Sequence, residues 1–123
     1  MENDNEVKEP APKYNYISPD EYLEMERASE EKHEYYDGYV VTLNGASLKH
    51  NYIAGNLYTK IGGFLEGSLC SILPSNMRVS TPNRDSYIYP DAIIVCNNPE
   101  LEDDKFDTLL NPSVIFEILC KFG

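Results

Sequence analysis

Two acidic residues lie inside apolar, strand-like segments of this 123-residue chain. Asp91 precedes the run AIIVC, and Glu117 lies within the run SVIFEILC. Successive side chains of a strand point to opposite faces, so each acid shares a face with apolar neighbours. Burying an ionised carboxylate is costly unless a cation or hydrogen-bond donors compensate for its charge. Two such residues on adjacent strands therefore predict a cation site.

The cation that suits this donor set is Mg²⁺ or Mn²⁺, because these ions commonly keep several waters and bind one or two protein carboxylates. The residues alone leave a second interpretation open. Each acid could instead lie solvated at a strand end, where surface acids are common, or pair with an arginine such as Arg78 or Arg84.

A helix is expected well before these strands. Ser18 is a typical N-cap residue, Pro19 occupies the first helical position, and Glu21 completes a capping box. The predicted helix runs from Pro19 to about His33, which we expect to be a surface residue at the helix end. The following segment, EYYDGYVVTL, contains an Asp-Gly turn and predicts a β-hairpin.

A second helix is predicted over residues 48–65, with Ser47 as its N-cap. Its apolar residues on one face predict the side that packs in the core: Ile53, Leu57, Ile61, Phe64 and Leu65. Strands are predicted over 70–79, broken by Pro74, and over 87–96, where Pro90 must lie at a strand start, an edge or a bulge. A further strand over 113–120 is apolar enough to be buried on both faces. This order of elements predicts an α/β or α+β sheet flanked by helices.

Length and composition bound the class of protein. The length suits one domain, and we expect residues 1–16 to form a frayed tail and 17–123 the domain itself. No apolar run is long enough to cross a bilayer, and the amino terminus is acidic and polar, unlike a targeting segment. We therefore expect a cytoplasmic protein with no membrane partner.

The charge balance argues against a broad basic surface for nucleic acid. The chain carries 10 Lys and Arg against 21 Asp and Glu, a net charge of −11. Affinity for phosphates comes largely from basic side chains. Binding of DNA would then depend on basic residues that gather locally, namely Lys49, Lys60, Arg78 and Arg84.

The cysteines are Cys70, Cys96 and Cys120, an odd number without a CxxC pair. We expect them to be buried small residues with free thiols in a reducing compartment, rather than parts of a disulfide or zinc site. The sequence also lacks the glycine-rich phosphate loops and the GxSxG motif, so nucleotide-binding and serine-hydrolase functions have no support.

Five segments in this order resemble the putative restriction endonuclease family of bacterial proteins. The resemblance runs from Ser18 to Leu119, and its segments are SPDEYLEMERASEEKHEYYDGYVV, GASLKHNYIAGNL, PSNMRV, YIYPDAIIVC and ELEDDKFDTLLNPSVIFEIL. That family belongs to the PD-(D/E)XK nuclease superfamily. The resemblance implies a restriction-endonuclease-like α/β fold, with a mixed central sheet flanked by helices.

The same resemblance implies a site for metal-assisted hydrolysis of DNA phosphodiester bonds. Asp91 and Glu117 match the metal-binding acids of the family. Glu34 matches an acid that joins the site from the end of the first helix, and His50 matches a histidine near the start of the second. Mg²⁺ or Mn²⁺ would polarise the phosphate and lower the pKa of the attacking water. A homodimer is expected, because cutting both strands of DNA needs two sites.

The chain departs from the family pattern after Glu117. The superfamily lysine of the Glu-x-Lys motif would stand at Leu119, and Lys121 is a poor substitute because it lies near the end of the chain. The last helix and strand of the fold are missing, so we expect a truncated chain with weak or no activity. The alternative function is a non-catalytic remnant that keeps the fold and binds a protein through an exposed edge or its acidic surface.

Overall fold

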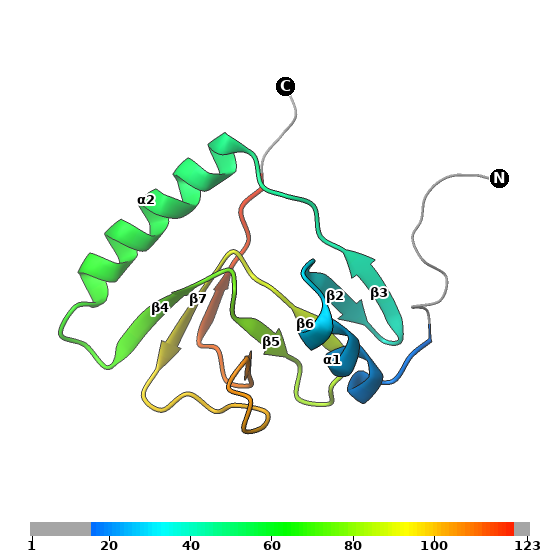
Figure 1. Ribbon diagram of the computed structural model, residues 1–123. Helices are drawn as coiled ribbons and strands as arrows, with labels where there is room; N and C mark the ends of the chain where they lie inside the picture. Colours follow the sequence, from blue (N-terminus) through cyan, green and yellow to red (C-terminus); the bar gives the residue numbers. More distant parts are fainter. Residues whose placement is uncertain (1–15, 120–123) are drawn as a thin grey trace. The chain divides into compact units, whose positions relative to one another are not determined.

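The computed structural model describes residues 16–119, which form two compact units (Figure 1). Unit 1 is drawn from the chain up to Asn44 and from Thr81–Ile88, and unit 2 from Gly45–Ser80 and from Tyr89 onward. The segment expected to be a tail lies outside the described residues except for Tyr16, and so does Cys120. No helix within the described part of the chain is long and apolar enough to span a membrane.

Unit 1 consists of one helix and three antiparallel strands in the order β3-β2-β6. The bounds are α1 (Pro19–Ala28), β2 (His33–Tyr36), β3 (Tyr39–Thr42) and β6 (Ser86–Ile88). The predicted capping box at Ser18 is confirmed, with Glu21 as the reciprocal partner. The predicted hairpin is also confirmed, and its turn uses positive φ angles at Asp37 and Gly38.

Helix α1 ends earlier than expected. It stops at Ala28 rather than near His33, and Ser29 is already extended. His33 is required in β2, where it pairs with Thr42 of β3. Strand pairing therefore overrides the local helix propensity of the intervening acidic residues.

Tyrosines form the centre of unit 1. Tyr22 of α1 is fully buried, and its ring lies 5.2 Å from that of Tyr35 and 5.3 Å from that of Tyr87, measured between centroids. Each buried hydroxyl of the first two has a partner: Tyr22 donates to the carbonyl of His33 and Tyr35 to that of Ile17. The rings supply the apolar area of a small core. Their hydroxyls link α1 and the segment before it to the sheet.

The expectation of a surface histidine at position 33 is wrong. His33 is buried, and its Nδ1 lies 2.8 Å from Oε1 of the buried Glu26. The other carboxylate oxygen of Glu26 accepts a hydrogen bond from the backbone N–H of His33 at 2.9 Å. The buried acid is thus satisfied by a side chain and a backbone group of the same residue.

Unit 2 contains one long helix and both kinds of strand pairing. Its elements are α2 (Leu48–Leu65), β4 (Cys70–Pro74), β5 (Arg78–Ser80), β7 (Ala92–Cys96), β8 (Thr108–Leu109) and β9 (Val114–Phe116). Strands β4, β7 and β9 form an antiparallel sheet in that order, and β5 pairs with β8 in parallel. Helix α2 packs on β4. The mixed α/β class is confirmed.

The predicted break at Pro74 is confirmed, since β4 ends there and β5 begins at Arg78. Pro90 lies between β6 and β7, which together replace the single strand expected over 87–96. Proline lacks the N–H that a continuous ladder needs. The predicted strand over 113–120 is shorter, and its expected burial on both faces is wrong, since Val114 and Ile115 are exposed.

Helix α2 has the predicted N-cap and the predicted bounds. Its inward face differs from the expectation: Ile53 is 39% exposed and Phe64 is 84% exposed, and Ala54 is the buried residue. The helix lies on a short three-stranded sheet, so only a narrow strip of its surface has a partner within the unit.

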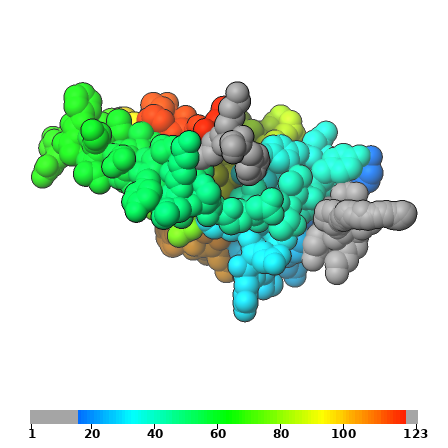
Figure 2. Space-filling model, turned by 90° about the horizontal axis from the view of Figure 1, so that it is seen from above, coloured from blue at the N-terminus to red at the C-terminus, as the bar shows by residue number. Residues whose placement is uncertain are grey.

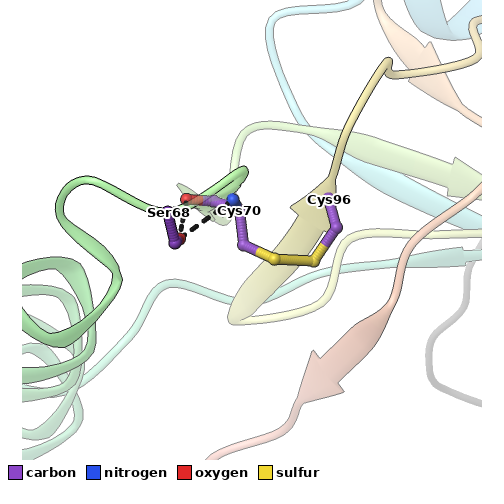
Figure 3. Close-up of a disulfide and its surroundings, with 3 residues drawn as sticks. All are labelled: Ser68, Cys70 and Cys96. Carbon is purple, nitrogen blue, oxygen red and sulfur yellow. Dashed lines mark hydrogen bonds between the residues drawn. A yellow bond between two sulfur atoms is a disulfide. The ribbon is translucent and has the colours of Figure 1, made fainter.

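The prediction of free cysteines is wrong for two of the three. Cys70 and Cys96 form a disulfide that joins β4 to β7 (Figure 3), and the two residues are direct partners in the antiparallel register. Ser68 flanks the bond and accepts a hydrogen bond from the N–H of Cys70. Sequence spacing could not reveal this pairing, because it depends on which residues the register places opposite each other.

We predict that loss of the Glu26 carboxylate destabilises the protein. Glu26→Ala leaves the buried His33 ring and N–H without their acceptor, which lowers the free energy of unfolding by about 3 kcal/mol. The matched control is Glu24→Ala in the same helix, where the side chain is exposed and the expected change is within about 0.5 kcal/mol. Urea denaturation measures both values, and equal effects of the two substitutions would contradict the role of the buried pair.

We also predict that the disulfide stabilises the chain, because it closes a loop between residues 26 positions apart and so restricts the unfolded state. Reduction should lower the free energy of unfolding by about 3 kcal/mol. The control is Cys70→Ser/Cys96→Ser, whose stability should not respond to a reducing agent. A wild-type urea transition that stays unchanged under reduction would show that the bond is absent in solution.

Candidate functional site

Asp91 lies at the entry to β7, directly after the bend at Pro90. Its side chain is 18% exposed, and both carboxylate oxygens have donors. Oδ1 lies 3.0 Å from Nε2 of His50, and Oδ2 accepts a hydrogen bond from the backbone N–H of Ile118 at 2.7 Å. The backbone N–H of Asp91 in turn donates to the carbonyl of Phe116 at 3.0 Å.

Helix α2 positions two of the groups that hold this aspartate. The Ser47 hydroxyl caps the helix by accepting from the N–H of His50, which fixes His50 in the first turn. Two turns later the hydroxyl of Tyr58 donates to the backbone carbonyl of Asp91 at 2.7 Å. Figure 1 shows the start of α2, the start of β7 and the end of β9 at the same end of unit 2.

The protonation of His50 follows from its partner. An ionised carboxylate can only accept, so Nε2 carries the proton and donates to Asp91. Nδ1 is buried without a hydrogen-bond partner among the described residues.

Glu117 follows β9 at the end where Asp91 precedes β7. The register pairs Ala92 with Phe116. One position further along, Asp91 and Glu117 therefore lie opposite each other. The Glu117 side chain is exposed. The predicted juxtaposition of the two carboxylates at one end of neighbouring strands is therefore present in the backbone pairing.

The donor set at this end of the sheet fits a hard divalent cation. Each Asp91 oxygen uses one acceptor position on a protein donor and keeps another. Mg²⁺ commonly binds through one or two carboxylates and retains its remaining waters. Within residues 16–119 no group of three or more His, Cys, Asp or Glu side chains is assembled that could hold a metal, so the fit rests on the two acids and on water.

Glu34 does not lie on a helix, contrary to the expectation. It belongs to β2 of unit 1 and accepts a hydrogen bond from the hydroxyl of Tyr36. Helix α1 ends six residues earlier, because the chain must turn before it enters the sheet. Its membership of the site stays a prediction.

The two arginines of the alternative interpretation each have an acidic partner elsewhere in the fold. Arg78 is buried and pairs with Asp107, and Arg84 pairs with Asp20. Position 119, where the superfamily lysine would stand, holds a leucine that is 91% exposed.

Two contacts of the site were missed in the sequence. Tyr58 falls on the inward face of α2 with His50 and Ala54, at positions i, i+4 and i+8, so its helical spacing was a usable signal. The contact with the Ile118 N–H could not be predicted from the sequence, because every residue other than proline has a backbone N–H.

Comparison with known proteins adds a family and a fold. Residues 19–121 match the Uma2 family, described as putative restriction endonuclease. The chain is 32% identical over 110 residues to an uncharacterized protein of Synechocystis sp., which covers 89% of this chain and 57% of that protein. A second uncharacterized Synechocystis protein is 32% identical over 99 residues, covering 80% of this chain and 56% of that protein.

A solved structure shares the fold. The crystal structure of a putative nuclease from Anabaena variabilis superimposes with a TM-score of 0.68 at 19% identity, covering 85% of this chain and 59% of that one. This likeness confirms the expected nuclease-like α/β fold. The chain spans a little more than half the length of all three proteins.

We predict that the Tyr58 hydroxyl contributes to stability through the backbone of Asp91. Tyr58→Phe removes one hydrogen bond to a part-buried carbonyl and should lower the free energy of unfolding by about 1 kcal/mol. Tyr52→Phe in the same helix is the control, because its side chain is 67% exposed and its loss should be close to zero. Urea titration of both variants checks this, and a Tyr52→Phe loss as large as that of Tyr58→Phe would refute it.

Proposed function

Because the chain belongs to the Uma2 family of putative restriction endonucleases, we propose that it is a metal-dependent endonuclease that hydrolyses phosphodiester bonds of DNA. The observation that carries the proposal is the attachment of Asp91. His50 and the N–H of Ile118 hold its carboxylate, and the register brings Glu117 to the same end of the sheet.

In this proposal Asp91 and Glu117 hold Mg²⁺ or Mn²⁺. The bound ion would polarise the scissile phosphate and lower the pKa of an attacking water. The two-carboxylate donor set and the spare acceptor positions on Asp91 support this choice of cation.

The remaining residues orient the acids. His50 donates from Nε2 and fixes the rotation of the Asp91 carboxylate, while the Ile118 N–H restrains its other oxygen. Tyr58 holds the Asp91 backbone in place. We propose Glu34 as a supporting acid.

Leu119 leaves the proposed site without the lysine that stabilises charge on the phosphate in the superfamily. A part of the longer relatives beyond the region matched here could supply such a group, since this chain spans little more than half their length. A homodimer would allow both strands of a duplex to be cut.

We predict metal-dependent nicking of supercoiled plasmid that requires both acids. The assay uses Mn²⁺ and two forms of the protein: this chain, and a chimera that continues with the C-terminal part of the first Synechocystis relative. Asp91→Asn and Glu117→Gln should each reduce the rate at least about a hundredfold, because loss of a metal ligand removes several kcal/mol of charge stabilisation. Glu100→Gln, an exposed acid of the same unit, is the control and should cut at the rate of its parent.

Thermal denaturation with Mn²⁺ provides a readout that does not depend on cutting. The ion should raise the melting temperature of the wild-type chain and not that of Asp91→Asn. Folded protein that neither nicks DNA nor responds to Mn²⁺, in both forms, would reject the nuclease proposal and favour a non-catalytic protein-binding role.

A further inference from the structure

Acidic residues are unevenly distributed along this acidic chain. Residues 38–65 contain no Asp or Glu, although the chain has 21 of them. Helix α2 lies wholly inside this stretch and carries Lys49, Lys60 and the half-buried His50. The surface of α2 is therefore a local exception to the net charge of −11.

The outward side of α2 combines these lysines with exposed aromatic and amide side chains. We name this set the α2 stripe; its members recur at intervals of three or four residues: Lys49, Tyr52, Asn56, Lys60 and Phe64. That spacing keeps them on one side of a helix. Tyr52 is 67% exposed and Phe64 84%. Figure 2 shows α2, in green, open to view along most of its length.

Neither lysine of the α2 stripe takes part in an ion pair between described residues of unit 2. The ion pairs described there join His50 to Asp91 and Arg78 to Asp107, and neither includes Lys49 or Lys60. Of the four basic residues singled out in the sequence, Arg78 and Arg84 have acidic partners, and the ion pairs of the described residues do not include the two lysines.

We propose that the α2 stripe is the surface on which duplex DNA lies, an inference that rests on the proposed function and adds the place where its substrate docks. Lys49 and Lys60 are 11 positions apart, which is about 16 Å along a helix. DNA carries one negative charge per ~1.7 Å of its axis, so both ammonium groups can meet phosphates of one duplex. Asn56 between them adds a hydrogen-bond donor for the backbone.

The position of the α2 stripe also matches the site. The helix that presents Lys49 outward presents His50 inward, onto Asp91. Lys49 lies in the first turn of α2, at the end of the helix where His50 contacts Asp91, so DNA bound at Lys49 would lie beside that end. The acid-free surface and the two lysines favour an anionic partner over a cationic one.

The test is DNA binding without cleavage. The full chain is titrated against a fluorescein-labelled 20-base-pair duplex in EDTA, and anisotropy is followed at several salt concentrations. Lys49→Gln/Lys60→Gln should weaken binding by about an order of magnitude per lysine at 0.1 M salt, and lower the slope of log affinity against log salt by about 2. Lys105→Gln removes an exposed lysine of the acidic loop and should change neither value.

Other results would overturn the proposal. Equal binding by wild type and the double variant, with both shown folded by circular dichroism, removes the α2 stripe as the docking surface. Nicking that persists at wild-type rate in the double variant does the same and leaves the proposed nuclease function intact. If Tyr52→Ala/Phe64→Ala abolishes self-association in sedimentation while the lysine variant binds DNA normally, the α2 stripe is a surface between two copies of the chain.

Discussion

The carboxylate of Asp91 must be compensated at the point where β7 begins, and two parts of unit 2 are organised by that requirement. The start of α2 supplies His50 and the chain after β9 supplies the Ile118 N–H to the carboxylate, while the Tyr58 hydroxyl from the middle of α2 binds the backbone carbonyl of Asp91. A part-buried negative charge is tolerated only with such donors. The contacts that stabilise the aspartate therefore also define where the helix lies on this end of the sheet.

The same principle governs the other buried ionic groups. In unit 1 the Glu26 carboxylate is satisfied by the ring and N–H of His33. In unit 2 the buried Arg78 guanidinium binds Asp107, Thr108 and Tyr89. These pairs use the ionisable groups of His33 and Arg78 inside the fold.

The sequence alone predicted those structural elements that depend on residues close together in the chain. The capping box of α1, the Asp-Gly hairpin and the Ser47 cap of α2 each depend on residues within a few positions of one another. Prolines divided two predicted strands, a rule that the sequence already contains. The end of α1 and the burial of β9 were not predictable in this way, since strand pairing decided the first and the narrow sheet of unit 2 the second.

The candidate site likewise contains some features that the sequence predicted and others that depend on the tertiary structure. Spacing was enough to mark Asp91 and Glu117 as residues that could act together, because each is a carboxylate inside an apolar strand, whereas His50 was added only by the resemblance to a family. The tertiary structure alone decided that His50 meets Asp91, that Cys70 is bonded to Cys96, and that Glu34 belongs to a strand. Register and helix packing bring together residues tens of positions apart, and no local pattern encodes which of them become neighbours.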